Sequence, residues 1–226
     1  MSTLSDTPGL RPLDGPASRT DLVAATLRDA ILTGALQPGE TLVERRLSEQ
    51  LGVSKTPVRE ALIGMAHTGL VTVAPNKGFT VRRLALADLR AVYQVRLLLE
   101  PWAAMTTARS GAPEPLRQAQ DALNEAAGLL SSGRNSELSA ANRRFHRALY
   151  SGCGNELVVD QLDGLRDLTS LGVVSMLWDR WPSWRDEFVE HAEILAAATD
   201  GSAEDVERLS REHLRSAMAK IDEAEG

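Results

Sequence analysis

Residues 84–226 contain no alternating apolar and polar segment long enough to form a β-strand, and this is the feature that most restricts the fold. Apolar residues recur instead at steps of three and four, the period of an amphipathic helix. The pattern predicts helices at residues 86–109, 113–132, 136–151, 155–177, 184–199 and 203–223. Because helices without a sheet bury their apolar faces against one another, an antiparallel all-α bundle is expected here.

The first part of the chain follows a different pattern. Residues 1–18 are rich in Ser, Pro, Gly and Asp, lack an apolar period, and are expected to form a disordered tail. From Thr20 an apolar stripe predicts a helix that stops at Gly34, and Pro38-Gly39 then predicts a turn. Residues 19–83 are therefore expected to form a separate domain.

Within that domain, two helical segments lie only a few residues apart. The first, about residues 44–51, is closed by Gly52, and the second begins with Thr56 as N-cap and Pro57 as first helical residue. This is the spacing of a helix-turn-helix. The following β-rich segments "LVTVA" and "FTVRR" flank "PNKG" and predict a small hairpin. The chain is thus expected to be mainly α, with a winged helix-turn-helix before the bundle.

The charges are unevenly distributed along the chain, whose net charge is −6. Residues 1–83 contain ten Lys and Arg against eight Asp and Glu, whereas the rest contains fifteen against twenty-three. Lys55 and Arg59 lie on the exposed face of the second short helix, where the helix-turn-helix reaches base edges. Arg45 and Lys77 are expected to meet phosphates or a neighbouring groove. This surface predicts DNA binding.

The run "GALQPGETLVERRLSEQLGVSKTPVREAL" with "GLVTVAPNKGFTV" resembles the winged-helix domain of the GntR family of bacterial transcription regulators. The resemblance implies that Arg45, Lys55, Thr56 and Arg59 occupy DNA-contacting positions and that Gly78 is the glycine of the wing. The family usually has Arg at the position of Lys55. Because Lys is a point charge and not a planar fork, a different operator preference is expected.

Three of the four histidines fall on buried stripes of the helical domain. The helices predicted at 184–199 and 203–223 form an antiparallel hairpin. About 12 Å of the first helix follows His191 and about 15 Å of the second precedes His213, so the two histidines are predicted at nearly the same level. Asn142 and His146 lie one turn apart on a third helix. Three imidazoles suit a divalent transition metal, with Zn or Ni as the leading choices. Separate hydrogen-bonded core histidines are the alternative.

The segments "NRRFH", "EHAEIL" and "REHL" resemble the ligand motifs of the FCD effector domain, the helical partner of one GntR subfamily whose regulators act in organic-acid metabolism. The resemblance implies the metal ligands Asn142, His146, His191 and His213. The subfamily commonly has Asp at the position of Asn142, so the amide is expected to weaken the site or change its selectivity. Arg96 resembles a position near the subfamily's ligand pocket; it is expected to pair either with an effector carboxylate or with Glu100.

Open metal positions permit either a sensor or an enzyme. A metal-dependent hydrolase would need a general base, for which Glu190, Glu193 or Glu212 are candidates. The fused DNA-binding module favours a sensor of a small carboxylate, expected to act as a repressor released by its ligand. A constitutive regulator with a purely structural metal is the alternative, and no enzymatic activity is expected.

A single winged helix contacts few base pairs, so specificity implies a homodimer on a palindromic operator, with the helical domain as the dimer surface. No apolar run approaches the roughly 18 to 20 residues that span a bilayer, and a cytoplasmic location is expected. Cys153 is interpreted as a packing residue. Trp178, Trp181 and Trp184 are expected to pack in the core, with a ligand pocket as the alternative.

Overall fold

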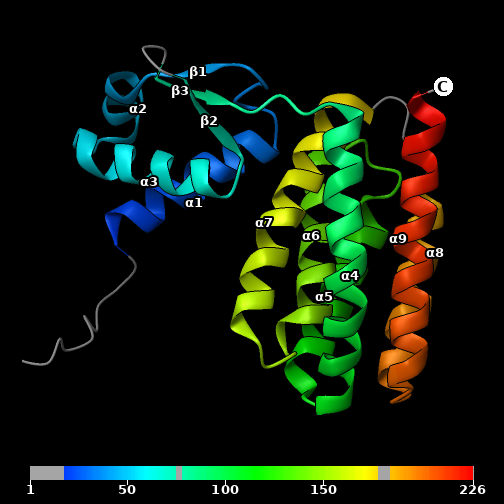
Figure 1. Ribbon diagram of the computed structural model, residues 1–226. Coiled ribbons are helices and arrows are strands. Elements are labelled where there is room, and N and C mark those ends of the chain that lie inside the picture. The colour runs from blue at the N-terminus through cyan, green and yellow to red at the C-terminus, as the bar shows by residue number, and fades with distance from the viewer. Residues whose placement is uncertain (1–17, 75–77, 178–183, 226) are drawn as a thin grey trace, which may run out of the picture.

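The computed structural model describes residues 18–74, 78–177 and 184–225. It consists of a small N-terminal domain with a β-sheet and a C-terminal bundle of long helices (Figure 1). The tail predicted for residues 1–18 lies, apart from Ser18, outside the described residues, as do Lys77, Trp178 and Trp181. Among the described helices, none is both long and apolar enough to cross a membrane.

The N-terminal domain begins with a capped helix. Ser18 is the N-cap of α1 (Arg19–Leu32), and its side chain and that of Asp21 bond reciprocally to each other's backbone N–H groups. This capping box satisfies two donors that a helix start leaves unpaired. Ser18 therefore belongs to the helix and not to the tail to which its composition assigned it.

The two short helices form the expected helix-turn-helix. Helix α2 (Glu44–Leu51) ends at Gly52, whose φ of 64° places it in the left-handed region that glycine tolerates. Helix α3 (Lys55–His67) begins one residue before Thr56, and its N-cap is Ser54. The expected N-cap at Thr56 was therefore wrong. Pro57 fits the third helical position as well, because the backbone N–H groups of the whole first turn lack intrahelical partners.

The predicted hairpin is present and carries a third strand. Strands β2 (Val71–Ala74) and β3 (Gly78–Val81) pair antiparallel, and β3 also pairs with β1 (Thr41–Leu42), which gives the sheet order β1-β3-β2. A strand of two residues has no readable alternation, which explains why the sequence did not reveal β1.

The C-terminal part is the predicted bundle, in which the first and last helices pack side by side along their length. Its elements are α4 (Leu86–Ser110), α5 (Pro113–Leu129), α6 (Asn135–Ser151), α7 (Glu156–Gly172), η1 (Val173–Leu177), α8 (Trp184–Thr199) and α9 (Ala203–Glu225). The helix expected at 155–177 changes after Gly172 into the π-helical segment η1. Such segments occur frequently at functional sites.

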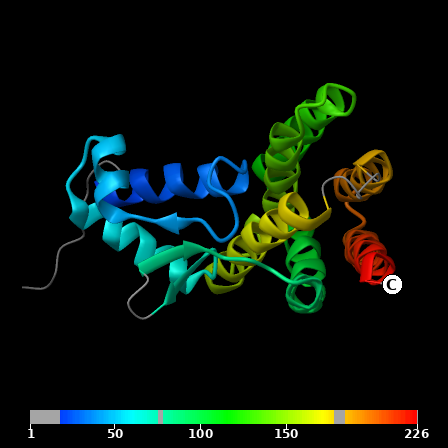
Figure 2. The same ribbon diagram turned by 90° about the horizontal axis from the view of Figure 1, so that it is seen from above.

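The two domains share a core through one helix. In Figure 2, α7 (yellow) lies between the N-terminal domain and the rest of the bundle. Leu171 of α7 belongs to the apolar cluster that otherwise consists of N-terminal residues, among them Ile31 and Leu62. The domains are thus joined by packing as well as by the chain.

Candidate metal centre and nucleic-acid surface

Three helices of the bundle bring three histidines together in its interior. His146 comes from α6, His191 from α8 and His213 from α9, and all three side chains are buried. Each sits on the apolar stripe of its helix; His191, for example, lies against the Phe145 ring with 4.5 Å between centroids. The convergence predicted from the hairpin geometry is confirmed.

The three imidazoles lie close enough together to be candidates for the ligands of a single ion. One ligand atom from each ring lies within 4.8 Å of the others, and the Nε2 atoms of His191 and His213 are 3.3 Å apart. Two ligands held tetrahedrally at about 2.0–2.1 Å from a zinc ion would be roughly 3.3 to 3.4 Å apart. His146 Nε2 is buried and has no hydrogen-bond partner among the described residues. The Nε2 atoms of His191 and His213 therefore have the spacing of two ligands of one ion, and His146 supplies a third imidazole within 4.8 Å.

Carboxylates hold the far side of two of these rings. His146 Nδ1 lies 2.6 Å from Glu100 Oε1, and His213 Nδ1 lies 2.6 Å from Glu190 Oε2. A neutral imidazole that donates through Nδ1 presents the lone pair of Nε2, and metal-binding histidines are commonly fixed in this way. Glu100 and Glu190 thus orient the two rings. Glu190 was considered only as a base from the sequence, and Glu100 only as a partner of Arg96.

The electrostatic environment keeps two of the histidines neutral. Burial, followed by the positive charge of Arg166, holds the pKa of His146 well below its usual range. Burial, followed by the two neighbouring imidazoles, does the same for the pKa of His191. Burial would raise the pKa of Glu100, but the charge of Arg96 and the contact with His146 outweigh it, so that this pKa is well below normal. Neutral imidazoles backed by an ionised carboxylate suit a divalent cation.

Asn142 lies next to this centre on the helix of His146 but is engaged elsewhere. It is half-buried, and its Oδ1 accepts a hydrogen bond of 3.4 Å from Arg166 Nη2. Metal ligation by Asn142 remains a prediction.

The two buried arginines differ in how far they are satisfied. Arg96 is fully buried, makes two bonds to Glu100 at 2.7 and 3.1 Å, and donates to Thr169 Oγ1 at 3.3 Å. Arg166 of α7 is also buried, and its Nε has no hydrogen-bond partner among the described residues. Burial and the charge of Arg96 lower the pKa of Arg166 to about 10. Arg96 thus has the Glu100 partner considered for it, and Arg166 is the residue that sequence reasoning missed.

Two small cavities flank the centre. A polar one of about 20 Å³ is lined by His146, His213, Arg166, Thr169 and Ser170, among others. An apolar one of about 20 Å³ is lined by Leu130 and Phe188, among others, and shares Asn142, Trp184 and Glu187 with the polar cavity. Trp184 also packs against the apolar cluster of Leu129 and Leu138. Each cavity holds about one water molecule or ion and is too small for a metabolite.

Of the three carboxylates considered as general bases, one contacts a histidine of the centre. Glu193 and Glu212 are exposed, and Glu212 pairs with Arg208 at 3.1 Å. Glu190 is bonded to His213. Among the described residues, the centre therefore contains none of them as a base free to act on a bound water.

The proposed DNA-contacting residues that the structure describes are all exposed on the N-terminal domain. Lys55, Thr56 and Arg59 are exposed in the first turns of α3. Arg45 is exposed on α2 and pairs with Glu49 at 2.9 Å. Gly78 opens β3 with φ of 71° and open space around the position of a Cβ. DNA contact by these residues remains a prediction.

The chain matches two family models, that of the gntR family of bacterial regulatory proteins over residues 19–81 and that of the FCD domain over residues 91–216. The transcriptional regulator McbR of Escherichia coli is 29% identical over 181 residues, 80% of this chain and 82% of that protein. An uncharacterized regulator of Streptomyces ambofaciens is 31% identical over 221 residues, 92% of this chain and 87% of that one.

Solved structures agree with these matches. The structure of E. coli McbR/YncC superposes with a TM-score of 0.82 at 26% identity and covers 93% of this chain and 100% of its own. That of a putative GntR regulator from Rhodococcus sp. RHA1 gives a TM-score of 0.76 at 27% identity, with 91% and 98% covered. The similarity thus extends over both domains.

Proposed function

We propose that this chain, which belongs to the gntR family of bacterial regulatory proteins, senses a small organic acid through a divalent metal in its helical domain. With its FCD domain it is a DNA-binding transcriptional regulator and not an enzyme. The observation that carries the proposal is the cluster of three buried imidazoles, whose ligand atoms lie within 4.8 Å of one another and include a pair of Nε2 atoms 3.3 Å apart. His146, His191 and His213 hold the metal, with Zn or Ni as the leading choices. A metal with open positions supplies a point of attachment for a carboxylate or hydroxyl group.

The positive charge of Arg166 indicates that the effector is an anion. A buried guanidinium with an unsatisfied Nε beside the metal site favours an anion, since burying a charge without a partner is costly. Arg96 was the first candidate for this contact. Its donors already serve Glu100 and Thr169, so we assign the direct contact to Arg166 and give Arg96 the role of fixing Glu100.

The DNA-binding half follows the family arrangement. Lys55, Thr56 and Arg59 of α3 read the major groove, while Arg45, Lys77 and Gly78 contact the backbone or a neighbouring groove. Two copies bind a palindromic operator as a homodimer in the cytoplasm, and the acid releases repression. The charge pattern supports this arrangement, because basic residues exceed acidic ones, ten to eight, in residues 1–83, whereas acidic residues prevail, twenty-three to fifteen, in the rest of the chain.

Elemental analysis of the purified protein, followed by a thermal-shift screen, tests metal and ligand together. Zn²⁺ or Ni²⁺ should raise the melting temperature of chelator-treated protein, and a further rise should come from acids in a panel spanning malate, citrate and phenylacetate. His213→Ala should abolish the metal response, whereas His67→Ala, which changes an exposed histidine outside the bundle, should retain it.

Operator titration then separates sensing from a structural role for the metal. A sensor changes its operator affinity about 5- to 150-fold when metal and acid are both present, the range typical of allosteric coupling. A constitutive regulator with a structural metal keeps the same affinity throughout. Operator binding that ignored metal removal and every acid that binds would refute the sensing proposal and leave the DNA-binding function intact.

A further inference from the structure

Resting on the proposed function, we infer that helix α7 is the mechanical link between the sensor pocket and the DNA-binding domain, because its two opposite faces belong to these two sites. Arg166, Thr169 and Ser170 of α7, together with Val173 at the start of η1, line the polar cavity beside the histidines. Gly164, Asp167, Leu168 and Leu171 face the N-terminal domain. Both sets follow steps of three and four, and at about 3.6 residues per turn their centres lie on nearly opposite sides of the helix.

The side of α7 that faces the N-terminal domain contacts the end of helix α3. Gly69, in the turn after α3, has the Leu168 methyl groups 3.7 Å from the position of a Cβ, and Gly164 approaches Thr68. Leu171 completes the apolar core of the N-terminal domain. A shift of α7 therefore acts directly on the elements that orient α3.

Charged side chains fix this contact. Arg28 of α1 pairs with Asp167 at 3.0 Å, and the Asp167 side chain is only 12% exposed. Arg143 of α6, the neighbour of Asn142, lies close enough to Asp167 and Asp29 for their charges to raise its pKa, although burial lowers it overall. Burial likewise raises the pKa of Asp167 against the opposing charges of Arg28 and Arg143. Helix α7 is thus tied to α1 by an ion pair, and the charged side chain of Arg143 on α6 lies near it.

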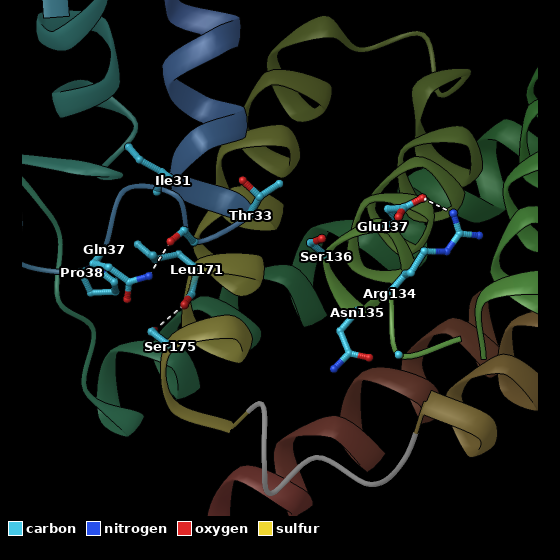
Figure 3. A pocket seen from close by; sticks show the side chains of 12 residues that line it. Ile31, Thr33, Gln37, Pro38, Arg134, Asn135, Ser136, Glu137, Leu171 and Ser175 are labelled. Atoms are coloured by element: carbon cyan, nitrogen blue, oxygen red, sulfur yellow. Dashed lines mark hydrogen bonds and ion pairs between the residues drawn. The ribbon is translucent and has the colours of Figure 1, made fainter. Parts of the chain in front are cut away.

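Beside this contact the structure contains a cavity between the two domains. A cavity of about 470 Å³ separates the α1–β1 turn from the start of α6. Figure 3 shows Gln37 and Pro38 beside Leu171 and Ser175, with Arg134 and Glu137 on the other side of the opening. The space allows the N-terminal domain to rotate about its contact with α7.

Occupation of the pocket has to displace one of its walls. The polar cavity of about 20 Å³ accepts an ion or a water molecule, whereas an organic acid needs several times that volume. Effector binding thus selects a state in which the walls, α7 among them, stand further apart. Such a differential affinity for two states is what coupling requires.

A cycle of variants tests the link without knowledge of the effector. Ser170→Phe places a bulky side chain on the pocket side of α7, and Asp167→Asn removes the ion pair on the opposite side. Operator DNA selected in vitro with the wild-type protein serves as ligand for the two single variants, the double variant and the wild type. Arg147→Ala is the control, because Arg147, 56% exposed against 50% for Arg28, pairs at 3.0 Å with Asp163 of α7 within the helical domain and not across the domain contact.

In the wild-type background, Ser170→Phe should change operator affinity by at least about fivefold. In the Asp167→Asn background, the change that Ser170→Phe causes should be smaller by about two- to fivefold, which is the effect of a partly exposed ion pair. Arg147→Ala should leave it intact. Equal changes in the Asp167→Asn and wild-type backgrounds, or an equal loss with Arg147→Ala, would overturn the link. If Ser170→Phe does not fold, Val173→Phe replaces it in the same cycle. Calorimetry with Zn²⁺ alone is a separate readout. If the protein binds no zinc but the variants change operator affinity as expected, the metal part of the proposed function is rejected and the role of α7 stands.

Discussion

Replacing Glu100 by Gln should damage both the stability and the metal affinity of the protein, in amounts that can be measured separately. Glu100 is almost fully buried, accepts two bonds from the fully buried Arg96 and one from His146 Nδ1. The Gln side chain keeps the shape but removes the charge that balances Arg96. Removing one partner of a buried ion pair costs about 3 to 5 kcal/mol. Loss of the carboxylate behind a metal-binding histidine costs about 10- to 100-fold in metal affinity.

Urea unfolding of the metal-free protein gives the first quantity, and zinc titration by calorimetry gives the second. Glu190→Gln is the control that separates them, because Glu190 also lies 2.6 Å from a histidine Nδ1 but its side chain is 29% exposed. Glu190→Gln should lose only about 1 kcal/mol of unfolding free energy. Its zinc affinity should fall by the same factor as that of Glu100→Gln, about 10- to 100-fold. If Glu100→Gln unfolds at the wild-type urea concentration and binds zinc as tightly, Glu100 neither balances Arg96 nor orients His146.

Three further predictions concern pH, DNA and the effector. Folding lowers the pKa of His191, so that at mildly acidic pH the unfolded metal-free chain binds a proton that the folded chain does not. The free energy of unfolding should therefore fall as the pH drops below about 6.5, by up to roughly 1.4 kcal/mol per pH unit for this group. Urea unfolding between pH 7.5 and 5 should show a shallower slope for His191→Leu but not for His67→Gln; identical slopes in all three would contradict this. Arg59→Ala should weaken operator binding by about 1 to 3 kcal/mol in fluorescence anisotropy, whereas the exposed Arg117→Ala should not. Equal effects would remove α3 from the interface. Arg166→Gln should weaken binding of any acid found in the thermal-shift screen by at least about tenfold, since a hydrogen bond to a charged group contributes about 1.5 to 3 kcal/mol; unchanged affinity would return the carboxylate contact to Arg96.

The convergence of the histidines was predictable because it depends on quantities that a sequence contains. The distance from His191 to the end of α8, and from the start of α9 to His213, follows from the rise per residue and a short turn. The helix bounds were readable for the same reason, since glycines such as Gly52 and Gly111 end helices in the left-handed conformation.

The parts that escaped prediction depend on contacts between elements. Arg166 lies within an ordinary helical pattern, and only the packing of α7 against α4 and α6 shows that its guanidinium is buried beside the histidines. Ser54 was not recognised as the N-cap because Thr56-Pro57 offers an equally good local signal. The π-helical segment after Gly172 has no sequence period of its own. In each case local preferences allowed more than one arrangement, and tertiary contacts selected one.

In the proposed sensor, the burial of the three histidines makes the metal a condition for sensing. Without an ion, His146 Nε2 stays unpaired in the interior, and a buried donor or acceptor without a partner costs about 1 to 3 kcal/mol. An ion removes this penalty and adds positive charge next to Arg166. An acid that enters then finds two cationic partners instead of one, and its binding energy can offset the separation of α7 from its neighbours. A metal-free protein offers the acid only Arg166, so the operator response should require metal and acid together.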